Sequence, residues 1–109
     1  MEAGDWVEAL RLGLEAVMKY GGARPGDRTM IDALHPALEA LQAGNLDTDL
    51  VLTLGRAVEA GRSGAERTKR MKAQAGRASY VAAEKVTGED PGALAAAAWF
   101  ASIGKVIAP

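Results

Sequence analysis

Two stretches of the chain combine glycines with polar or charged side chains, as loops that bind a ligand often do. The first is GGARPGDRTM at residues 21–30. The second lies much further along, where GRASY at residues 76–80 is followed by DPGA at residues 90–93. Glycine lets a backbone approach a ligand closely, because it has no Cβ. The pattern predicts that two loops of the folded chain converge on one ligand.

Arg77 is the first candidate for a contact with phosphate. Its guanidinium group is a rigid fork of donors that matches phosphate oxygens and stays charged at every relevant pH. It lies between Gly76 and the small residues Ala78 and Ser79. An ordinary surface arginine is the alternative, since the chain has 13 basic residues.

The sequence Asp90-Pro91-Gly92 predicts the start of a helix, with aspartate as the cap and proline at the first helical position. Helix N-termini also bind anions through free amides and the helix dipole. A structural role and a ligand-binding role are therefore compatible at these three residues.

The loop at residues 21–30 also has a local explanation. Gly21 and Gly22 can end a helix, and Pro25-Gly26 is typical of a turn. Met30 can fill the core or pack on a base, because its side chain is flexible and polarizable. These local patterns alone do not decide between a helix connection and a binding loop.

Other catalytic chemistry has little support in the sequence. The chain has no cysteine, and its single histidine, His35, has no partner at triad or metal spacing. Asp27 and Asp32 could be offered as metal ligands, but a magnesium phosphate site normally needs carboxylates that converge from a preformed loop. We predict that His35 is structural and assign no metal ligand.

The apolar periodicity predicts an all-α fold, an antiparallel bundle of about four to five helices. The first helix is expected from an Asp5–Glu8 capping box to about Tyr20, with Trp6, Val7, Leu10, Leu14 and Val17 on one face. The second is expected from about Thr29 to Ala43, capped by Asp27 or Thr29, kinked at Pro36, and burying Met30, Leu34, Leu38 and Leu41. The third helix is expected to begin at an Asp47 or Thr48 cap, and its helical period continues from Leu50 to Met71. Two further elements follow: a short helical segment from about Ser79 to Val86 and a last helix from Asp90 to near Val106.

Three glycines interrupt the third helix, and each costs about 1 kcal/mol relative to alanine. They are Gly55, Gly61 and Gly64. Their presence predicts close approach by a neighbouring helix or a ligand.

Length, charge and hydrophobic content narrow the class of protein to which the chain can belong. At 109 residues with 49% hydrophobic residues and a net charge of −1, the chain predicts one small globular domain. A slightly negative charge and 5% aromatic residues argue against a nucleic-acid binder. The longest weakly polar run is shorter than a membrane span, and no signal peptide is visible, so we expect a cytoplasmic location and no membrane partner.

Three motifs, PGDRTMIDAL, TKRMKAQAGRASY and EDPGALAAAAWF, resemble the nucleotide-binding domain of dihydroxyacetone (glycerone) kinases, of the L-subunit or DhaL type. They occur in the family's order and at closely similar spacing. The resemblance runs from about Trp6 to about Ile107 and corresponds to the C-terminal half of that eight-helix domain. It predicts that residues 1–109 form a single, partial domain.

The resemblance implies an ADP or ATP site. Gly21 and Met30 match family positions close to bound nucleotide, and the full GRASY motif favours a ligand role for Arg77. Together with the helix start at residues 90–92, the full set of predicted nucleotide-binding residues is Gly21, Thr29, Met30, Arg77, Asp90, Pro91 and Gly92.

The resemblance also implies phosphoryl transfer to dihydroxyacetone, which the family holds on a separate K-type domain or subunit. The family's N-terminal half carries an aspartate-rich loop that holds magnesium, and this sequence contains no such segment. We therefore name no catalytic residue and expect Mg²⁺ only together with that half. The isolated chain is predicted to have negligible kinase activity.

The resemblance leaves the phosphoryl donor open. Some family members consume ATP, others keep ADP that a phosphotransferase-system partner rephosphorylates, and an animal branch also cyclises FAD. Helices cut from a larger barrel would expose apolar faces, which predicts self-association or pairing with an N-terminal half. The alternative is a non-catalytic helical interaction or oligomerisation module derived from the same domain.

Overall fold

The computed structural model describes residues 3–71 and 88–107. Within these ranges the chain forms α1 (Ala3–Gly21), α2 (Ile31–Ala43), α3 (Leu50–Arg67), the 3₁₀ turn η1 (Thr68–Arg70) and α4 (Pro91–Ile107). The predicted all-α fold is confirmed. The short helix expected from about Ser79 to Val86 lies outside the described residues.

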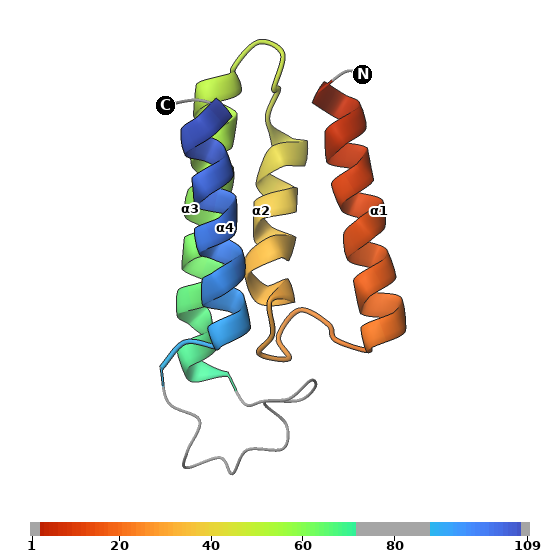
Figure 1. Cartoon of the computed structure of the whole chain (residues 1–109), viewed down its shortest axis with the longest axis vertical. Helices are drawn as coiled ribbons and strands as arrows, with labels where there is room; N and C mark the ends of the chain where they lie inside the picture. Colours follow the sequence, from red (N-terminus) through yellow and green to blue (C-terminus); the bar gives the residue numbers. More distant parts are fainter. Residues whose placement is uncertain (1–2, 72–87, 108–109) are drawn as a thin grey trace.

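The four helices run antiparallel to one another in sequence order (Figure 1). α2 lies in the middle of the bundle and packs on α3, while α4 packs on α3 and α2, and α1 contacts α2 at one edge. One end of the bundle, here called the loop end, carries residues 22–30, 68–71 and 88–92. The opposite end, the turn end, carries residues 44–49 and both chain termini.

The core consists of apolar side chains, from alanine to phenylalanine in size, at the contacts between helices. One cluster joins α2, α3 and α4, a second joins α1 to α2, and a third lies near the loop end. Their buried members are, respectively, Ala37, Leu41, Leu54, Ala57 and Phe100; Leu14, Ile31 and Leu38; and Ala33, Ala65 and Ala93. The third cluster contains only alanines, so the backbones of α2, α3 and α4 lie close together just behind the loop end.

α1 differs from its prediction at its start and on its apolar face. It begins at Ala3, so Asp5 lies inside the first turn and the predicted capping box is wrong. Leu14 is buried, whereas Trp6 and Val17 are exposed. The physical reason is that α1 packs mainly on α2 at the edge of the bundle, and this contact does not cover the whole predicted face.

α2 begins at Ile31, two residues later than predicted. The residue before it is Met30, which makes no side-chain cap, and Asp27 binds the amide of Arg24 instead, so capping by Asp27 is wrong. The hydroxyl of Thr29 does accept a hydrogen bond from the amide of Ile31, the first residue of α2, as the alternative prediction expected. Met30 is 39% exposed and is not part of the core, in contrast to the prediction. Leu38 and Leu41 are buried as predicted, and Leu34 is partly buried.

α3 begins at Leu50 after Asp49, so the predicted cap at Asp47 or Thr48 is wrong. Leu50 and Val51 are exposed although they follow the helical period. The α-helix ends at Arg67 and tightens into η1, where the Thr68 hydroxyl donates to the carbonyl oxygen of Ala65. The predicted helix through Met71 is therefore too long.

The glycines of α3 show which of them permit close packing. A Cβ on Gly64 would clash with the backbone oxygen of Asp32, and one on Gly61 would lie 3.5 Å from the backbone oxygen of Ala33. Close approach is confirmed at both positions. A Cβ on Gly55 would meet nothing within 4 Å, so among the described residues no neighbouring helix approaches Gly55 closely.

α4 begins as predicted, with the side chain of Asp90 accepting a hydrogen bond from the amide of Ala93 at 2.9 Å and Pro91 at the first helical position. It carries one charged residue, Lys105. No helix among residues 3–71 and 88–107 has both the length and the apolar character needed to span a membrane.

Candidate functional site

The loop at residues 22–30 is shaped by two aspartates. Asp27 accepts a hydrogen bond from the amide of Arg24 at 2.8 Å. Asp32 accepts from the amide of Gly26 at 2.6 Å and from the amide of Thr29 at 3.0 Å. The positive φ of Gly26, 96°, fits the predicted turn. Both carboxylates therefore organise this loop, and their engagement with backbone amides does not fit a magnesium site.

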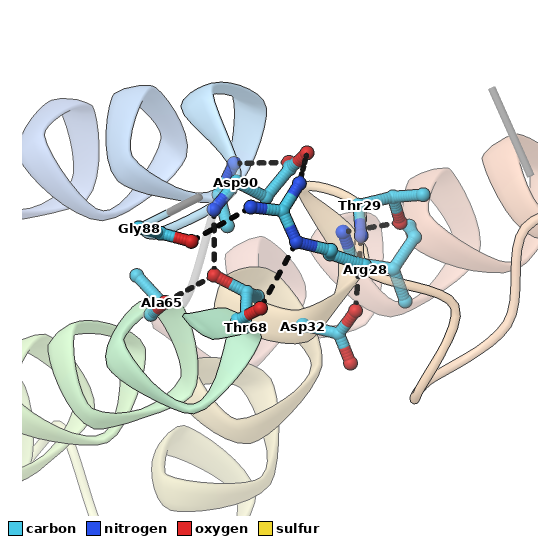
Figure 2. A network of polar contacts seen from close by, with 9 residues as sticks. Arg28, Thr29, Asp32, Ala65, Thr68, Gly88 and Asp90 are labelled. Atoms are coloured by element: carbon cyan, nitrogen blue, oxygen red, sulfur yellow. Dashed lines mark hydrogen bonds and ion pairs between the residues drawn. The ribbon is translucent and has the colours of Figure 1, made fainter. Parts of the chain in front are cut away.

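Arg28 is the residue that connects this loop to the rest of the loop end (Figure 2). It is 3% exposed and has a positive φ of 64°. Its Nε donates to the backbone oxygen of Thr68 at 3.0 Å, and one terminal nitrogen donates to the backbone oxygen of Gly88 at 2.7 Å. The other terminal nitrogen lies 3.5 Å from a carboxylate oxygen of Asp90. One side chain thus joins three segments that are far apart in sequence.

Thr68 and Asp90 extend the same network. The hydroxyl of Thr68 accepts a hydrogen bond from the amide of Asp90 at 2.7 Å and donates to Ala65. The Asp90 carboxylate uses one oxygen for Arg28 and the other for the amide of Ala93. Arg28, Thr68 and Asp90 are buried, although Gly88 is exposed, so the hydrogen bonds among these three residues are shielded from water and strengthened.

The network brings several predicted site residues to one surface. Thr29 is partly buried, while Met30, Pro91 and Gly92 are exposed. A Cβ on Gly92 would lie 3.1 Å from Asp90 Oδ2 and 3.7 Å from the amide nitrogen of Met30. The missing side chain at Gly92 therefore leaves space beside Met30, next to the positive end of the α4 dipole.

The other two predicted site residues are Gly21 and Arg77. Gly21 ends α1 at the loop end, is exposed, and has open space around it. The left-handed conformation that ends α1 belongs to Gly22, whose φ is 78° and whose amide donates to the oxygen of Met18. Arg77 lies outside the described residues.

The charges exposed at the loop end include an ion pair. The ammonium group of Lys69 lies 3.1 Å from a carboxylate oxygen of Glu89. A hydrogen bond from its own backbone amide, and then the nearby Lys69, lower the pKa of Glu89 below its ordinary value. Glu89 is therefore ionised at neutral pH and offsets part of the positive charge of Lys69.

A hollow lies at the turn end. It has a volume of about 290 Å³ and is lined by the first turns of α1, the end of α2 and the following turn, including Val7, Leu41 and Asn45. None of the predicted site residues lines it. The hollow and the loop end are at opposite ends of the bundle, so they cannot form one site.

Sequence reasoning missed Arg28 and Thr68 as organising residues. Arg28 lies inside the PGDRTM motif, directly before the predicted contact Thr29. The sequence did contain one indication of this role: Arg28 is a charged residue within a glycine-proline turn, and such a residue must be either solvated or paired. Its partners could not be read from the sequence.

The chain is a helical domain in which residues 28–30 and 88–92 meet at the start of α4. Residues 1–105 match the DAK2 domain family, and the chain therefore belongs to this family. This confirms the predicted kinship with the nucleotide-binding domain of dihydroxyacetone kinases.

Several curated proteins are similar to the chain. It is 48% identical over 103 residues to human triokinase/FMN cyclase, which covers 94% of the chain and 18% of that protein. It is 48% identical over 106 residues to the dihydroxyacetone kinase of Citrobacter freundii, with 95% and 18% covered. It is 36% identical over 99 residues to the L-erythrulose 1-kinase of Mycolicibacterium smegmatis, with 91% and 17% covered. The chain spans less than a fifth of the length of these relatives.

Proposed function

We propose that the chain is the ADP- or ATP-binding portion of a dihydroxyacetone-kinase-type enzyme. The single observation that carries this proposal is the adjacency of Met30 and Gly92 at the loop end. The amide nitrogen of Met30 lies 3.7 Å from where a Cβ of Gly92 would be. The two residues are at the starts of different helices, Met30 just before α2 and Gly92 in the first turn of α4. Such a surface offers an apolar side chain to a base and the N-terminus of α4 to phosphate.

The roles of the site residues follow from this arrangement. Met30 packs on the base, and the backbone of Pro91 and Gly92 lies against the phosphates, because Gly92 has no side chain in the way. Thr29 fixes the start of α2 by accepting a hydrogen bond from the amide of Ile31 at 3.2 Å. Asp90 acts through its cap on α4 and its pairing with Arg28. Gly21 and Arg77 complete the proposed set, Arg77 as the cation for phosphate.

The proposed reaction is phosphoryl transfer to dihydroxyacetone held by a K-type domain or subunit. That chemistry requires positioning and neutralisation of charge, with little covalent work by the protein. Magnesium, when bound with the nucleotide, supplies most of the neutralisation, and its aspartate loop is not among these 109 residues. We therefore propose that these residues bind and orient the nucleotide, and that the isolated chain is inactive as a kinase.

Calorimetric titration with ADP, with and without magnesium, tests the proposed site. Arg77→Ala is the site variant, and Arg62→Ala is its control, because Arg62 is an exposed arginine that pairs with Glu59. We expect saturable binding that Arg77→Ala weakens about tenfold or more, as loss of a charge-assisted phosphate contact predicts. Absence of binding at millimolar ADP, or equal effects of both variants, would refute the site.

A second candidate, a helical interaction module, has its own supporting observation. Large apolar side chains are exposed on α1 and α4, among them Trp6 at 65%, Tyr20 at 82%, Trp99 at 59% and Val106 at 83%. Large exposed apolar patches on a protein surface often mark sites of interaction with another protein. Trp99 and Val106 are seven residues apart on α4 and so share a face.

Light scattering with W99Q/V106Q distinguishes this candidate. An oligomer that becomes monomeric in the double variant would support self-association through α4. If the unsubstituted chain is a monomer and does not bind an N-terminal half of a related domain, the interaction module is ruled out. Either result leaves the calorimetric test of nucleotide binding unaffected.

A further inference from the structure

We propose that Arg28 is a positioning residue, which clamps residues 88–92, at the start of α4, beside residues 28–30, just before α2. Its purpose, to shape a nucleotide site, rests on the proposed function. The clamp itself rests on the contacts of Arg28 and can be tested without any nucleotide.

The guanidinium group of Arg28 is fully engaged within the protein. Three of its nitrogens face three acceptors, on Thr68, Gly88 and Asp90. At 3% exposure, it has no free face for a ligand. Arg28 therefore acts on the ligand surface indirectly, through the segments that it joins.

The segments that Arg28 joins are distant in sequence. Thr68 is 40 residues away and Gly88 is 60 residues away. Bringing two distant points of a chain together costs conformational entropy, which grows slowly with the length of the closed loop. Arg28 offsets this cost at the point where the Met30 backbone and Gly92 meet.

Arginine is the side chain that suits this task. Its planar fork can serve several acceptors in fixed directions, whereas the ammonium group of lysine is a compact point charge. The positive φ of Arg28 also supports a positioning role, since such a backbone conformation is uncommon for a residue with a side chain. The three long-range contacts of the Arg28 side chain hold the backbone in this conformation.

Pairing with Arg28 also controls the charge of the surface. The Asp90 carboxylate lies beside the proposed phosphate position, because one of its oxygens is 3.1 Å from where a Cβ of Gly92 would be. Arg28 neutralises this carboxylate from the buried side. Without Arg28, an uncompensated negative charge would face the phosphates.

Hydrogen exchange in the unliganded chain tests the clamp. We compare Arg28→Gln with Thr53→Val, a matched variant that removes a buried hydroxyl holding the amide of Asn45 at the turn end. The relevant amides are those of Asp90, which donates to Thr68, and Ala93, which donates to Asp90. Urea unfolding of each variant gives the change in global stability.

We expect Arg28→Gln to accelerate exchange at these two amides at least about tenfold beyond the global change, as loss of a hydrogen bond to a charged group predicts. Thr53→Val should leave them at the rate set by its global stability. If both variants change these amides by the global amount alone, Arg28 is a general stabilising residue and the proposal fails.

A measurement on the unsubstituted chain covers the case in which Arg28→Gln does not fold. The Nε–H group of Arg28 should exchange with solvent at least about tenfold more slowly than that of the exposed Arg62. Equal exchange rates for the two groups would overturn the clamp.

An ADP titration separates the clamp from the proposed function. Where the chain binds ADP, Arg28→Gln should weaken binding at least about tenfold and Thr53→Val less than about twofold. A chain with slow Arg28 exchange that does not bind ADP retains the clamp but refutes the proposed function. ADP binding that is equal in Arg28→Gln and the unsubstituted chain refutes the clamp as a positioning device.

Discussion

The loop end and the turn end of the bundle connect helices in two different ways. At the turn end, Asn45 organises the connection between α2 and α3 locally: its side-chain oxygen accepts hydrogen bonds from the amides of Asp47 and Thr48. At the loop end, the main contacts of Arg28 reach 40 and 60 residues along the chain. The turn end is thus a local connection, whereas the loop end exists only when the whole bundle has formed.

This difference shows how a small helical domain can build a surface for a ligand. A local turn holds its shape through its own sequence and needs no distant partner. A surface made from two helix starts requires a link between them, and here the link is a buried ion pair with hydrogen bonds. Removal of one partner from such a pair is costly, because the other charge stays buried without compensation.

The largest expected effect comes from breaking the link at the loop end. Arg28→Ala should lower the free energy of unfolding by about 3–5 kcal/mol, the range for loss of one partner from a buried ion pair. Urea unfolding measures this value. The control Arg62→Ala should change it by no more than about 0.5 kcal/mol, because Arg62 is exposed. A loss below about 1 kcal/mol at Arg28 would contradict the account.

A smaller effect is expected just behind the loop end, where α2 and α3 touch. Gly64→Ala places a Cβ against the backbone oxygen of Asp32 and should destabilise the protein by about 1–3 kcal/mol through overpacking. Gly55→Ala, in the same helix, meets open space and should stabilise it by up to about 1 kcal/mol. Thermal unfolding of the two variants should therefore give shifts of opposite sign; shifts of the same sign would disprove the close contact at Gly64.

At the turn end, Thr53→Val removes one buried hydroxyl that holds the amide of Asn45 at 3.2 Å. The expected loss is about 1 kcal/mol, the typical contribution of one hydrogen bond. Amide chemical shifts should change around Asn45 and stay constant at residues 28–30 and 88–92. Changes at the loop end would show that the two ends are coupled, and the contrast between them would be wrong.

The smallest effect concerns the partly exposed pair Lys69–Glu89 at the loop end. The pKa of Glu89 is lowered from 4.5 by its own backbone amide and then by Lys69. A lowered folded-state pKa stabilises the protein above the unfolded-state pKa, and this contribution is lost as the pH falls through the folded-state pKa. An NMR titration of the Glu89 carboxyl carbon should therefore have a midpoint below 4.5. In Lys69→Met the midpoint should rise but stay below 4.5, since the backbone hydrogen bond remains; an unchanged midpoint would show that the pair does not form.

The parts of the fold that the sequence predicted correctly depend on local chemistry. The order of the helices and the start of α4 at Asp90-Pro91 are confirmed, because each reflects a helical period or a cap within a few residues. The starts of the first three helices are less accurate, since several neighbouring polar residues could serve as the cap. Asp32 illustrates the problem: it lies inside α2 but organises the loop before it.

The parts that the sequence could not predict depend on distant contacts. The exposure of Met30 follows from the late start of α2, and the burial of Arg28 follows from partners in η1 and before α4. Helical periodicity carries no information about either feature. Resemblance to a family selected Met30 as a neighbour of a ligand, and the predicted helix start selected Gly92; the structure brings these two residues together. The resemblance did not select Arg28, because Arg28 makes its contacts within the protein.

The most direct test of the account is an NMR titration of the ¹⁵N-labelled chain with ADP. We expect saturable shift changes at the amides of Thr29, Met30 and Gly92, with the amides of residues 44–49 unchanged. Shift changes confined to the hollow at the turn end, or none at millimolar ADP, would contradict the claim that the loop end is a nucleotide site.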